Sequence, residues 1–176
     1  MMPPSISLTP LHVSELENFY TVCQDTELRK YLMEGMEMTF DDCQNLIFAN
    51  DEFVSKNKIG LYLIKLTGEI IGYGGFKKTY PVSDKIDFIY AISGKYFGQG
   101  LGAQIAGDLI AKFKESCCFA NKITAVVNPK NIASIKILEK YNFILKGFAE
   151  GELDHLYLYE LYIWLSDAKV QEAFFV

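Results

Sequence analysis

A glycine-rich junction between a predicted strand and a predicted helix constrains the fold of this chain more than any other segment. Residues 93–103 read Ser-Gly-Lys-Tyr-Phe-Gly-Gln-Gly-Leu-Gly-Ala, directly after a β-rich run at 86–92. Beyond the glycines, apolar side chains recur every four residues, at Leu101, Ile105, Leu109 and Phe113. This spacing predicts a helix of about fifteen residues with one buried stripe. The chain must therefore pass from a sheet into a helix through this loop.

The glycines of this loop are suited to binding an anion. The first N–H groups of a helix have no partner within it, and glycine lets a ligand approach the backbone closely. We therefore predict a pyrophosphate site here; the alternative is a turn that serves only tight strand-to-helix geometry. Gly98, Gly100 and Ala103 also satisfy a dinucleotide G-x-G-x-x-A fingerprint, but that motif belongs after the first strand of a βαβ unit and here follows three strands. A P-loop ending in Gly-Lys-Ser/Thr is missing.

The remaining patterns predict a sheet interleaved with helices. The runs 60–65 and 70–76 flank a Thr67-Gly68 turn and predict a hairpin, which the strand at 86–92 extends. Thr39 is the expected N-cap of a helix at 40–53. Other strands are expected at 6–8, 122–127 and 156–165, and other helices at 11–23 and 132–138. This order predicts a mixed α/β fold with a partly antiparallel sheet.

Length and composition favour one acidic domain that does not bind nucleic acid. The 176 residues, half of them apolar, are enough for the core of one domain. We expect this domain to span 1–166, with 167–176 as a C-terminal tail. The net charge of -5 argues against a DNA or RNA partner. Of the 17 basic residues only Arg29 is an arginine, so a bound phosphate is expected to meet backbone amides or lysines.

Cellular location and metal content are also constrained by the sequence. Residues 1–10 lack the basic start and apolar run of a secretory signal, and no stretch approaches the ~20 apolar residues of a membrane span. We therefore expect a cytoplasmic protein with no membrane partner. No metal is expected, because the chain has two histidines and its cysteines lack metal-ligand spacing. Buried free thiols are the simpler interpretation of the cysteines, Cys23, Cys43, Cys117 and Cys118.

Two segments, taken together, resemble a known family. The first is Tyr96-Phe97-Gly98-Gln99-Gly100-Leu101-Gly102-Ala103, and the second is Asn128-Pro129-Lys130-Asn131-Ile132-Ala133-Ser134, followed by Leu138-Glu139-Lys140-Tyr141-Asn142-Phe143. They resemble the GNAT superfamily of acyl-CoA-dependent N-acetyltransferases, in particular the RimJ/RimL-like branch, whose characterised members acetylate protein N-termini. The resemblance implies a single-domain fold with a mixed, mostly antiparallel twisted sheet of about seven strands flanked by helices. It also implies transfer of acetyl from acetyl-CoA to a primary amine, on a protein N-terminus or a small molecule.

The resemblance assigns cofactor contacts residue by residue. The backbone around Ile92 would pair with the pantetheine arm, and Asn131 would contact the same arm. Asn131 would equally well cap the helix that begins at Ile132. The pyrophosphate would be held by the amides of Gly98, Gln99, Gly100, Leu101, Gly102 and Ala103.

Amine acetylation also requires an acid and a base. The ammonium must lose a proton before it attacks, and the departing thiolate, with a pKa near ~8.5, benefits from a proton donor. By resemblance, Asp87 would be the base, acting through water, and Ser134 the acid. The alternatives are a strand-surface carboxylate and a polar first-turn residue. A backbone amide of the strand at 86–92 would stabilise the oxyanion.

The sequence departs from the wider superfamily at three positions. Leu138 occupies the place of a catalytic tyrosine, which excludes a tyrosine acid there. Phe97 stands where an arginine or glutamine is common. Asn142 replaces a glycine before Phe143, a change that left-handed backbone tolerates.

The amine side of the site is weakly encoded. An acidic cluster before the last strand would attract a cationic amine or would simply be solvated: Glu150, Glu152, Asp154 and His155. The aromatic run that follows is expected to pack within the strand: Tyr157, Tyr159, Tyr162 and Trp164. The rival functional class is a catalytically idle acyl-CoA-binding or sensing module. Either a monomer or a homodimer is compatible with the sequence.

Overall fold

One seven-stranded sheet organises the chain, in the order β1-β2-β3-β4-β5-β7-β6. The computed structural model describes residues 5–32, 35–78, 85–116 and 120–163, and the statements below refer to these. The strands are β1 Ile6–Pro10, β2 Leu61–Leu66, β3 Glu69–Lys78, β4 Ile86–Ile92, β5 Lys122–Val127, β6 Ile144–Phe148 and β7 Tyr157–Tyr162. All neighbouring pairs are antiparallel except β4 and β5, which are parallel. The expected mixed, mostly antiparallel sheet is confirmed.

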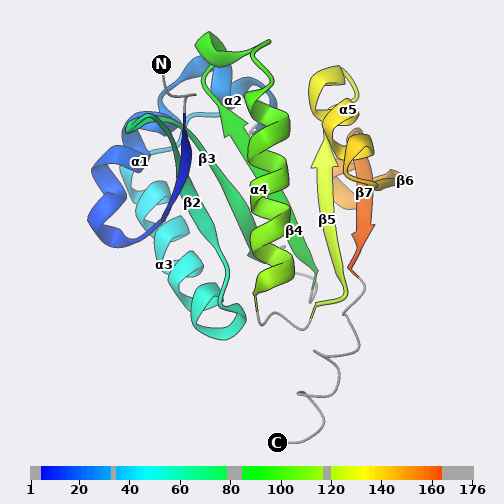
Figure 1. Ribbon diagram of the computed structural model, residues 1–176, viewed down its shortest axis with the longest axis horizontal. Helices are drawn as coiled ribbons and strands as arrows, with labels where there is room; N and C mark the ends of the chain where they lie inside the picture. Colours follow the sequence, from blue (N-terminus) through cyan, green and yellow to red (C-terminus); the bar gives the residue numbers. More distant parts are fainter. Residues whose placement is uncertain (1–4, 33–34, 79–84, 117–119, 164–176) are drawn as a thin grey trace, which may run out of the picture.

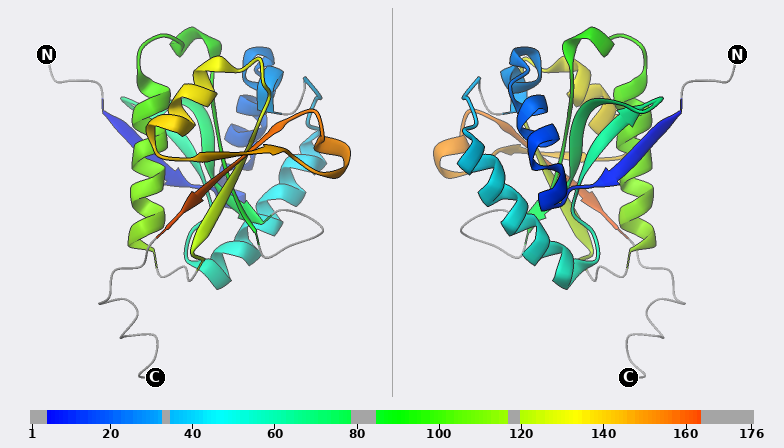
Figure 2. Two further views of the ribbon diagram at one scale, coloured as in Figure 1. Left: turned by 90° about the vertical axis from the view of Figure 1, so that its right-hand side faces the viewer. Right: turned by 90° about the vertical axis from the view of Figure 1, so that its left-hand side faces the viewer.

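Helices cover both faces of the sheet (Figures 1 and 2). On one face lie α1 Leu16–Cys23, α2 Thr26–Leu32 and α3 Phe40–Asn57, and on the other lie α4 Leu101–Glu115 and α5 Ile132–Lys140. Short 3-10 turns occur at Val13–Glu15, Gly94–Tyr96 and Gly151–Leu153. Helices α1, α2 and α3 pack on the half of the sheet that contains β3 and β4, since α1 and α3 contact β3 and α2 contacts β4.

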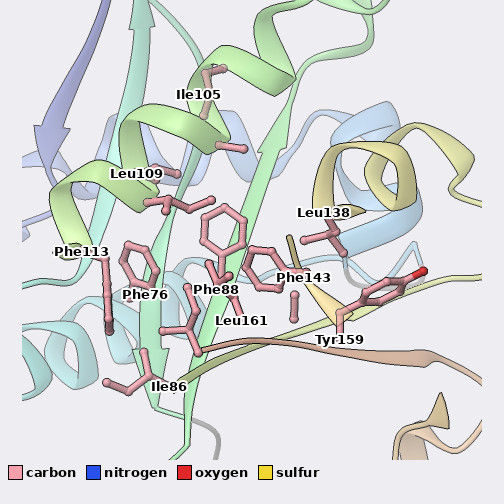
Figure 3. Packing of buried hydrophobic residues seen from close by; sticks show 14 of the residues in the cluster. Phe76, Ile86, Phe88, Ile105, Leu109, Phe113, Leu138, Phe143, Tyr159 and Leu161 are labelled. Carbon is pink, nitrogen blue, oxygen red and sulfur yellow. The ribbon is translucent and has the colours of Figure 1, made fainter. Parts of the chain in front are cut away.

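The core beneath α4 and α5 is rich in phenylalanine (Figure 3). Phe76 of β3 packs on Phe113 of α4 with ring centroids 4.8 Å apart. Phe88 of β4 stacks on Phe143, which follows α5, at 5.7 Å. These ring contacts pack β3 against α4, and β4 against the residue that follows α5. A second cluster under α1 and α3 includes Phe19 and Tyr73, in edge-to-face contact at 5.0 Å.

Local sequence signals explain several helix ends. Thr39 caps α3 as predicted: its hydroxyl accepts the Asp42 N–H at 3.1 Å, and the Asp42 carboxylate accepts the Thr39 N–H at 2.9 Å. After α5, Asn142 adopts φ 64°, so the left-handed backbone expected at this position is confirmed.

Most predicted elements occur where the sequence places them, with four differences, one of which is that α2 was not predicted. The bounds of β4, α4 and β5 agree with the prediction. A continuous helix at 11–23 is wrong, because a 3-10 turn precedes α1, which begins at Leu16. The predicted last strand at 156–165 is shorter, since β7 ends at Tyr162; Trp164 and Leu165 lie outside the described residues. Finally, β6 was not predicted. Its apolar residues Ile144, Leu145 and Phe148 are exposed, so the sequence lacks the alternation of buried apolar and exposed polar residues that predicts a strand.

Within the described ranges, no helix is both long and apolar enough to cross a membrane. Cys23 and Cys43 are buried and free, as expected, whereas Cys117 and Cys118 fall outside those ranges. The described part of the chain also shows no group of three or more histidine, cysteine and acidic side chains that could bind a metal.

Candidate active site

The site begins where β4 and β5 separate. These parallel strands pair only at Ile86 with Ile123 and at Asp87 with Thr124. On its other edge β4 stays paired with β3 along its whole length, and Ser93 N donates to Ile71 O at 2.8 Å. Because alternate residues of a strand direct their backbone groups to opposite neighbours, Phe88, Tyr90 and Ile92 direct theirs into the gap toward β5. The separation therefore leaves backbone donors and acceptors of β4 facing an opening.

A cavity of about 750 Å³ occupies this opening. Three residues of α2 line it: Glu27, Leu28 and Lys30. The remaining walls are the separated ends of β4 (88–92) and β5 (125–127), the glycine loop before α4 (96–98 and 100–103), and the first turn of α5 with its approach (130–134). The cavity thus brings both sequence motifs together, although they are about thirty residues apart in the chain.

The glycine loop has the conformation expected of an anion site. Gly98 and Gly100 adopt φ 75° and 78°, where side chains are disfavoured, and a Cβ at either position would find no atom within 4 Å. Gly100 is the N-cap of α4, and the first helical bond runs from Gln104 N to Gly100 O at 3.3 Å. The N–H groups of the first turn, from Leu101 to Ala103, consequently have no helical partner.

The predicted loop residues line the cavity with one exception. Gln99 is not among the lining residues, and its side chain donates to Lys95 O at 3.2 Å. Lys95 also points elsewhere, since its ammonium pairs with Glu69 at 2.6 Å, an interaction that raises the pKa of Lys95. The lysines that reach the cavity are Lys30 and Lys130. Arg29 does not; it is buried and pairs with Glu37 at 3.2 Å.

The first turn of α5 presents Ser134 to the cavity. Asn131 caps this helix, because its side-chain oxygen accepts the Ser134 N–H at 3.1 Å. The capping role is therefore confirmed, and Asn131 also lines the cavity, where its contact with a cofactor stays a prediction.

Tyr90 is a cavity residue that the sequence analysis missed. Its hydroxyl donates to Ser134 Oγ at 3.5 Å, and burial raises the pKa of the phenol, which stays protonated near neutral pH. This contact is longer than an ordinary hydrogen bond between two hydroxyl groups. The available signal was the position of Tyr90, which shares the α4–α5 face of β4 with Phe88 and Ile92.

The structure places the two predicted catalytic residues on opposite faces of β4. Asp87 alternates with Ile89 and Ala91, which pack toward α1 and α3, whereas Ser134 meets Tyr90 on the α4–α5 face. Asp87 also lies one residue before the cavity-lining stretch of β4, at the closed end of the gap. Any joint action of Asp87 and Ser134 therefore requires a substrate that reaches through the opening between the strands.

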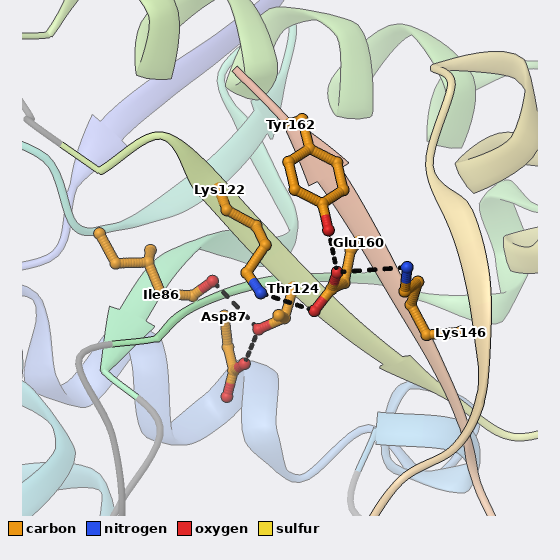
Figure 4. Close-up of polar contacts among 7 residues, drawn as sticks. All are labelled: Ile86, Asp87, Lys122, Thr124, Lys146, Glu160 and Tyr162. Carbon is orange, nitrogen blue, oxygen red and sulfur yellow. Dashed lines mark hydrogen bonds and ion pairs between the residues drawn. The ribbon is translucent and has the colours of Figure 1, made fainter. Parts of the chain in front are cut away.

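A polar row crosses the sheet at this closed end (Figure 4). Asp87, Thr124 and Glu160 are in register on β4, β5 and β7. Glu160 is only 7% exposed, and it accepts from Lys122 at 2.8 Å and from the Tyr162 hydroxyl at 2.8 Å. Lys146 lies 4.0 Å away from the same carboxylate. The hydrogen bond from Lys122 is the main cause that lowers the pKa of Glu160, so this carboxylate stays charged despite its burial.

The acidic cluster before β7 lies apart from the cavity. Glu150, Asp154 and His155 are exposed and do not line it, and Asp154 pairs with His155 at 3.9 Å. The side chain of Glu152 is not among those described. In the aromatic run, Tyr159 is buried as predicted, but Tyr162 is 43% exposed.

Comparison with known proteins now identifies the family. The profile of the acetyltransferase (GNAT) domain matches residues 5–144. The chain belongs to the GNAT acetyltransferases. The uncharacterized N-acetyltransferase p20 of Bacillus licheniformis is 25% identical over 162 residues, which cover 86% of this chain and 90% of that protein.

Solved structures share the fold of this acetyltransferase at low identity. The ribosomal L7/L12 alpha-N-protein acetyltransferase RimL, in complex with coenzyme A, has a TM-score of 0.73 and 17% identity, covering 92% of this chain and 96% of that one. The aminoglycoside acetyltransferase AAC(6')-Ib, also with coenzyme A, has a TM-score of 0.70 and 17% identity, covering 96% and 98%. The expected single-domain GNAT fold is thereby confirmed.

The residues around the cavity fit an acyl-CoA. Open space surrounds Gly98 and Gly100 next to the first turn of α4, whose N–H groups have no helical partner, and this suits a pyrophosphate. The backbone of β4 from Phe88 to Ile92 offers donors and acceptors along the gap, which suits the amides of a pantetheine arm.

The Glu160 cluster generates a stability prediction. We expect Glu160→Gln to lower the free energy of unfolding at pH 7 by about 1–3 kcal/mol, because it weakens hydrogen bonds to a buried charge. Since the folded pKa of Glu160 is lowered, its contribution is complete above the ordinary value of 4.5 and is lost as the pH falls through the folded value. Urea unfolding between pH 7 and pH 3 should show a shallower pH dependence for Glu160→Gln than for wild type. The exposed Glu150→Gln is the control, and identical pH dependence of all three proteins would contradict the assignment.

Proposed function

We propose that this protein transfers acetyl from acetyl-CoA to a primary amine by direct attack, without a covalent acyl-enzyme. The observation that carries the proposal is the cavity between the separated ends of β4 and β5, lined by a glycine loop with open space around Gly98 and Gly100. In this proposal the amides of Gly98 to Ala103 bind the pyrophosphate. The backbone at Ile92 pairs with the pantetheine arm, and Asn131 contacts the same arm through the amide group that the cap leaves available.

The side chains that flank the cavity supply proton transfer. Asp87 accepts, through water, the proton that the ammonium loses before attack and releases it to solvent. Ser134 donates its proton to the departing sulfur as the C–N bond forms and the C–S bond breaks. The serine regains a proton from the nitrogen of the new amide, so that protons balance. The phenol of Tyr90 occupies one lone pair of Ser134 Oγ, which leaves the serine proton available to the cavity. A backbone N–H of β4 that faces the gap stabilises the oxyanion.

Two acceptor classes are supported by the structural neighbours. RimL is an alpha-N-protein acetyltransferase, and AAC(6')-Ib is an aminoglycoside acetyltransferase. We keep a protein N-terminus, as in the RimJ/RimL-like branch, as the first candidate and a small-molecule amine as the second. The catalytically idle acyl-CoA-binding module is the remaining alternative. A cytoplasmic location, the 1–166 domain boundary and the absence of a metal stay predictions.

The test of this function is release of free thiol from acetyl-CoA by the purified protein. The acceptors should be peptides with varied N-termini, polyamines, aminoglycosides and amino acids. Turnover with one class supports the transferase and identifies its substrate. Tight coenzyme A binding in calorimetry without turnover would instead support the idle module, and the absence of both would refute the acyl-CoA site.

Gly100 gives a direct test of the pyrophosphate site. We expect Gly100→Asp to weaken coenzyme A binding about 100-fold or more, because its carboxylate would repel the anion at the start of α4. Gly100→Asn is the matched control: asparagine tolerates the left-handed backbone and carries no charge, so it should retain much more affinity. Titration calorimetry with coenzyme A distinguishes the two, and equal affinities would place the phosphates elsewhere.

Ser134 tests the acid. We expect Ser134→Ala to reduce kcat about 100-fold while leaving coenzyme A affinity nearly unchanged, because only the hydroxyl is lost and the Asn131 cap binds the backbone N–H. Ser134→Thr keeps a hydroxyl and should recover part of the rate. Wild-type turnover in Ser134→Ala would remove this residue from the mechanism.

A further inference from the structure

Thr124 is almost completely buried beside the predicted base. Its side chain lies in the middle of β5, the residue is 2% exposed, and its hydroxyl donates to Asp87 Oδ1 at 2.5 Å (Figure 4). The same oxygen lies 3.2 Å from Ile86 O on β4. Since a hydroxyl has one proton, the shorter contact to the carboxylate is the stronger of the two.

The position of this contact in the sheet is unusual. Asp87 and Thr124 form the last registered pair of β4 and β5, and the next residues of β4 already line the cavity. The hydroxyl of Thr124 therefore bridges β5 and β4 at the point where the two strands begin to separate. It fixes the carboxylate at the closed end of the gap, where an acyl group that enters from the glycine loop would end.

We propose that Thr124 is a positioning residue for the reaction: by donating to Asp87 it orients this carboxylate beside the gap. The inference rests on the proposed role of Asp87 as the base. A hydrogen bond to a charged group is among the stronger ones in proteins, so this contact holds the carboxylate in one orientation.

Other charged groups surround Asp87 and stay in place when Thr124 is changed. Lys77 is its register partner on β3, and Lys122 lies on β5 two residues before Thr124. Beyond Thr124, Glu160 of β7 is paired with Lys122 and Tyr162, and Lys146 of β6 lies at the far side. Among the described residues of this cluster, the Thr124 hydroxyl is the group that lies within hydrogen-bond distance of Asp87.

The matched variants are Thr124→Val, which keeps the shape and loses the hydroxyl, and Thr124→Ser, which keeps the hydroxyl. Tyr162→Phe is the control, because it removes a hydroxyl from the same face that bonds Glu160 and not Asp87. Two readouts are needed: kcat and KM measured separately with the acceptor found by the thiol-release screen, and the carboxyl-carbon NMR signal of Asp87 at the pH of the assay. The second readout needs no turnover and is assigned by its loss in Asp87→Asn.

For Thr124→Val we expect kcat to fall about tenfold and the Asp87 NMR signal to move, because the carboxylate loses its donor. The KM for acetyl-CoA should not change, and Thr124→Ser and Tyr162→Phe should behave as wild type. Wild-type kcat in a folded Thr124→Val, or an unchanged Asp87 NMR signal, would overturn the inference. If Asp87→Asn retains full activity, the base of the proposed function is wrong, and Thr124 then has no part in the reaction even if its contact moves the NMR signal.

Discussion

The site depends on the short pairing between β4 and β5. Parallel β4 and β5 share two registered pairs and then separate, although both continue as strands. Backbone groups that face such a gap need other partners, so an opening of this kind persists only where the surrounding packing holds it. Here the packing comes from α4 and α5: Phe88 of β4 stacks on Phe143, and Leu138 of α5 is buried in the same cluster (Figure 3). The core thus stabilises the separation that creates the cavity.

The two helices that hold the strands apart also start at the cavity, but they are not equivalent. Asn131 satisfies one first-turn N–H of α5 with its side chain. Gly100 offers no side-chain cap to α4, a helix of 15 residues, so the donors of its first turn remain directed at the opening. An anion is therefore favoured at α4, while α5 contributes a hydroxyl, Ser134. In the proposed function, phosphate binding and proton transfer therefore belong to separate helices.

How far the sequence predicts this arrangement depends on whether a signal is local. The bounds of β4, α4 and β5 follow from patterns within each segment, and Thr39 and Asn131 follow from capping chemistry. The edge strand β6 was not predicted because its apolar residues are exposed and a bulge interrupts its pairing with β7 between Leu145 and Gly147. The contact of Thr124 with Asp87 was not predicted because the two residues are 37 positions apart, and sheet register cannot be derived from one strand alone.

The two faces of the sheet give the amine and the thiol different surroundings. Tyr90 and Ser134 lie on the α4–α5 face, where the phenol donates to the serine hydroxyl. Asp87 lies on the other face, in register with Lys77 of β3 and Thr124 of β5. A departing thiolate needs donors, and an incoming ammonium needs an acceptor for its proton. An acyl-CoA threaded between the strands would meet both requirements from opposite sides, which a closed sheet could not provide.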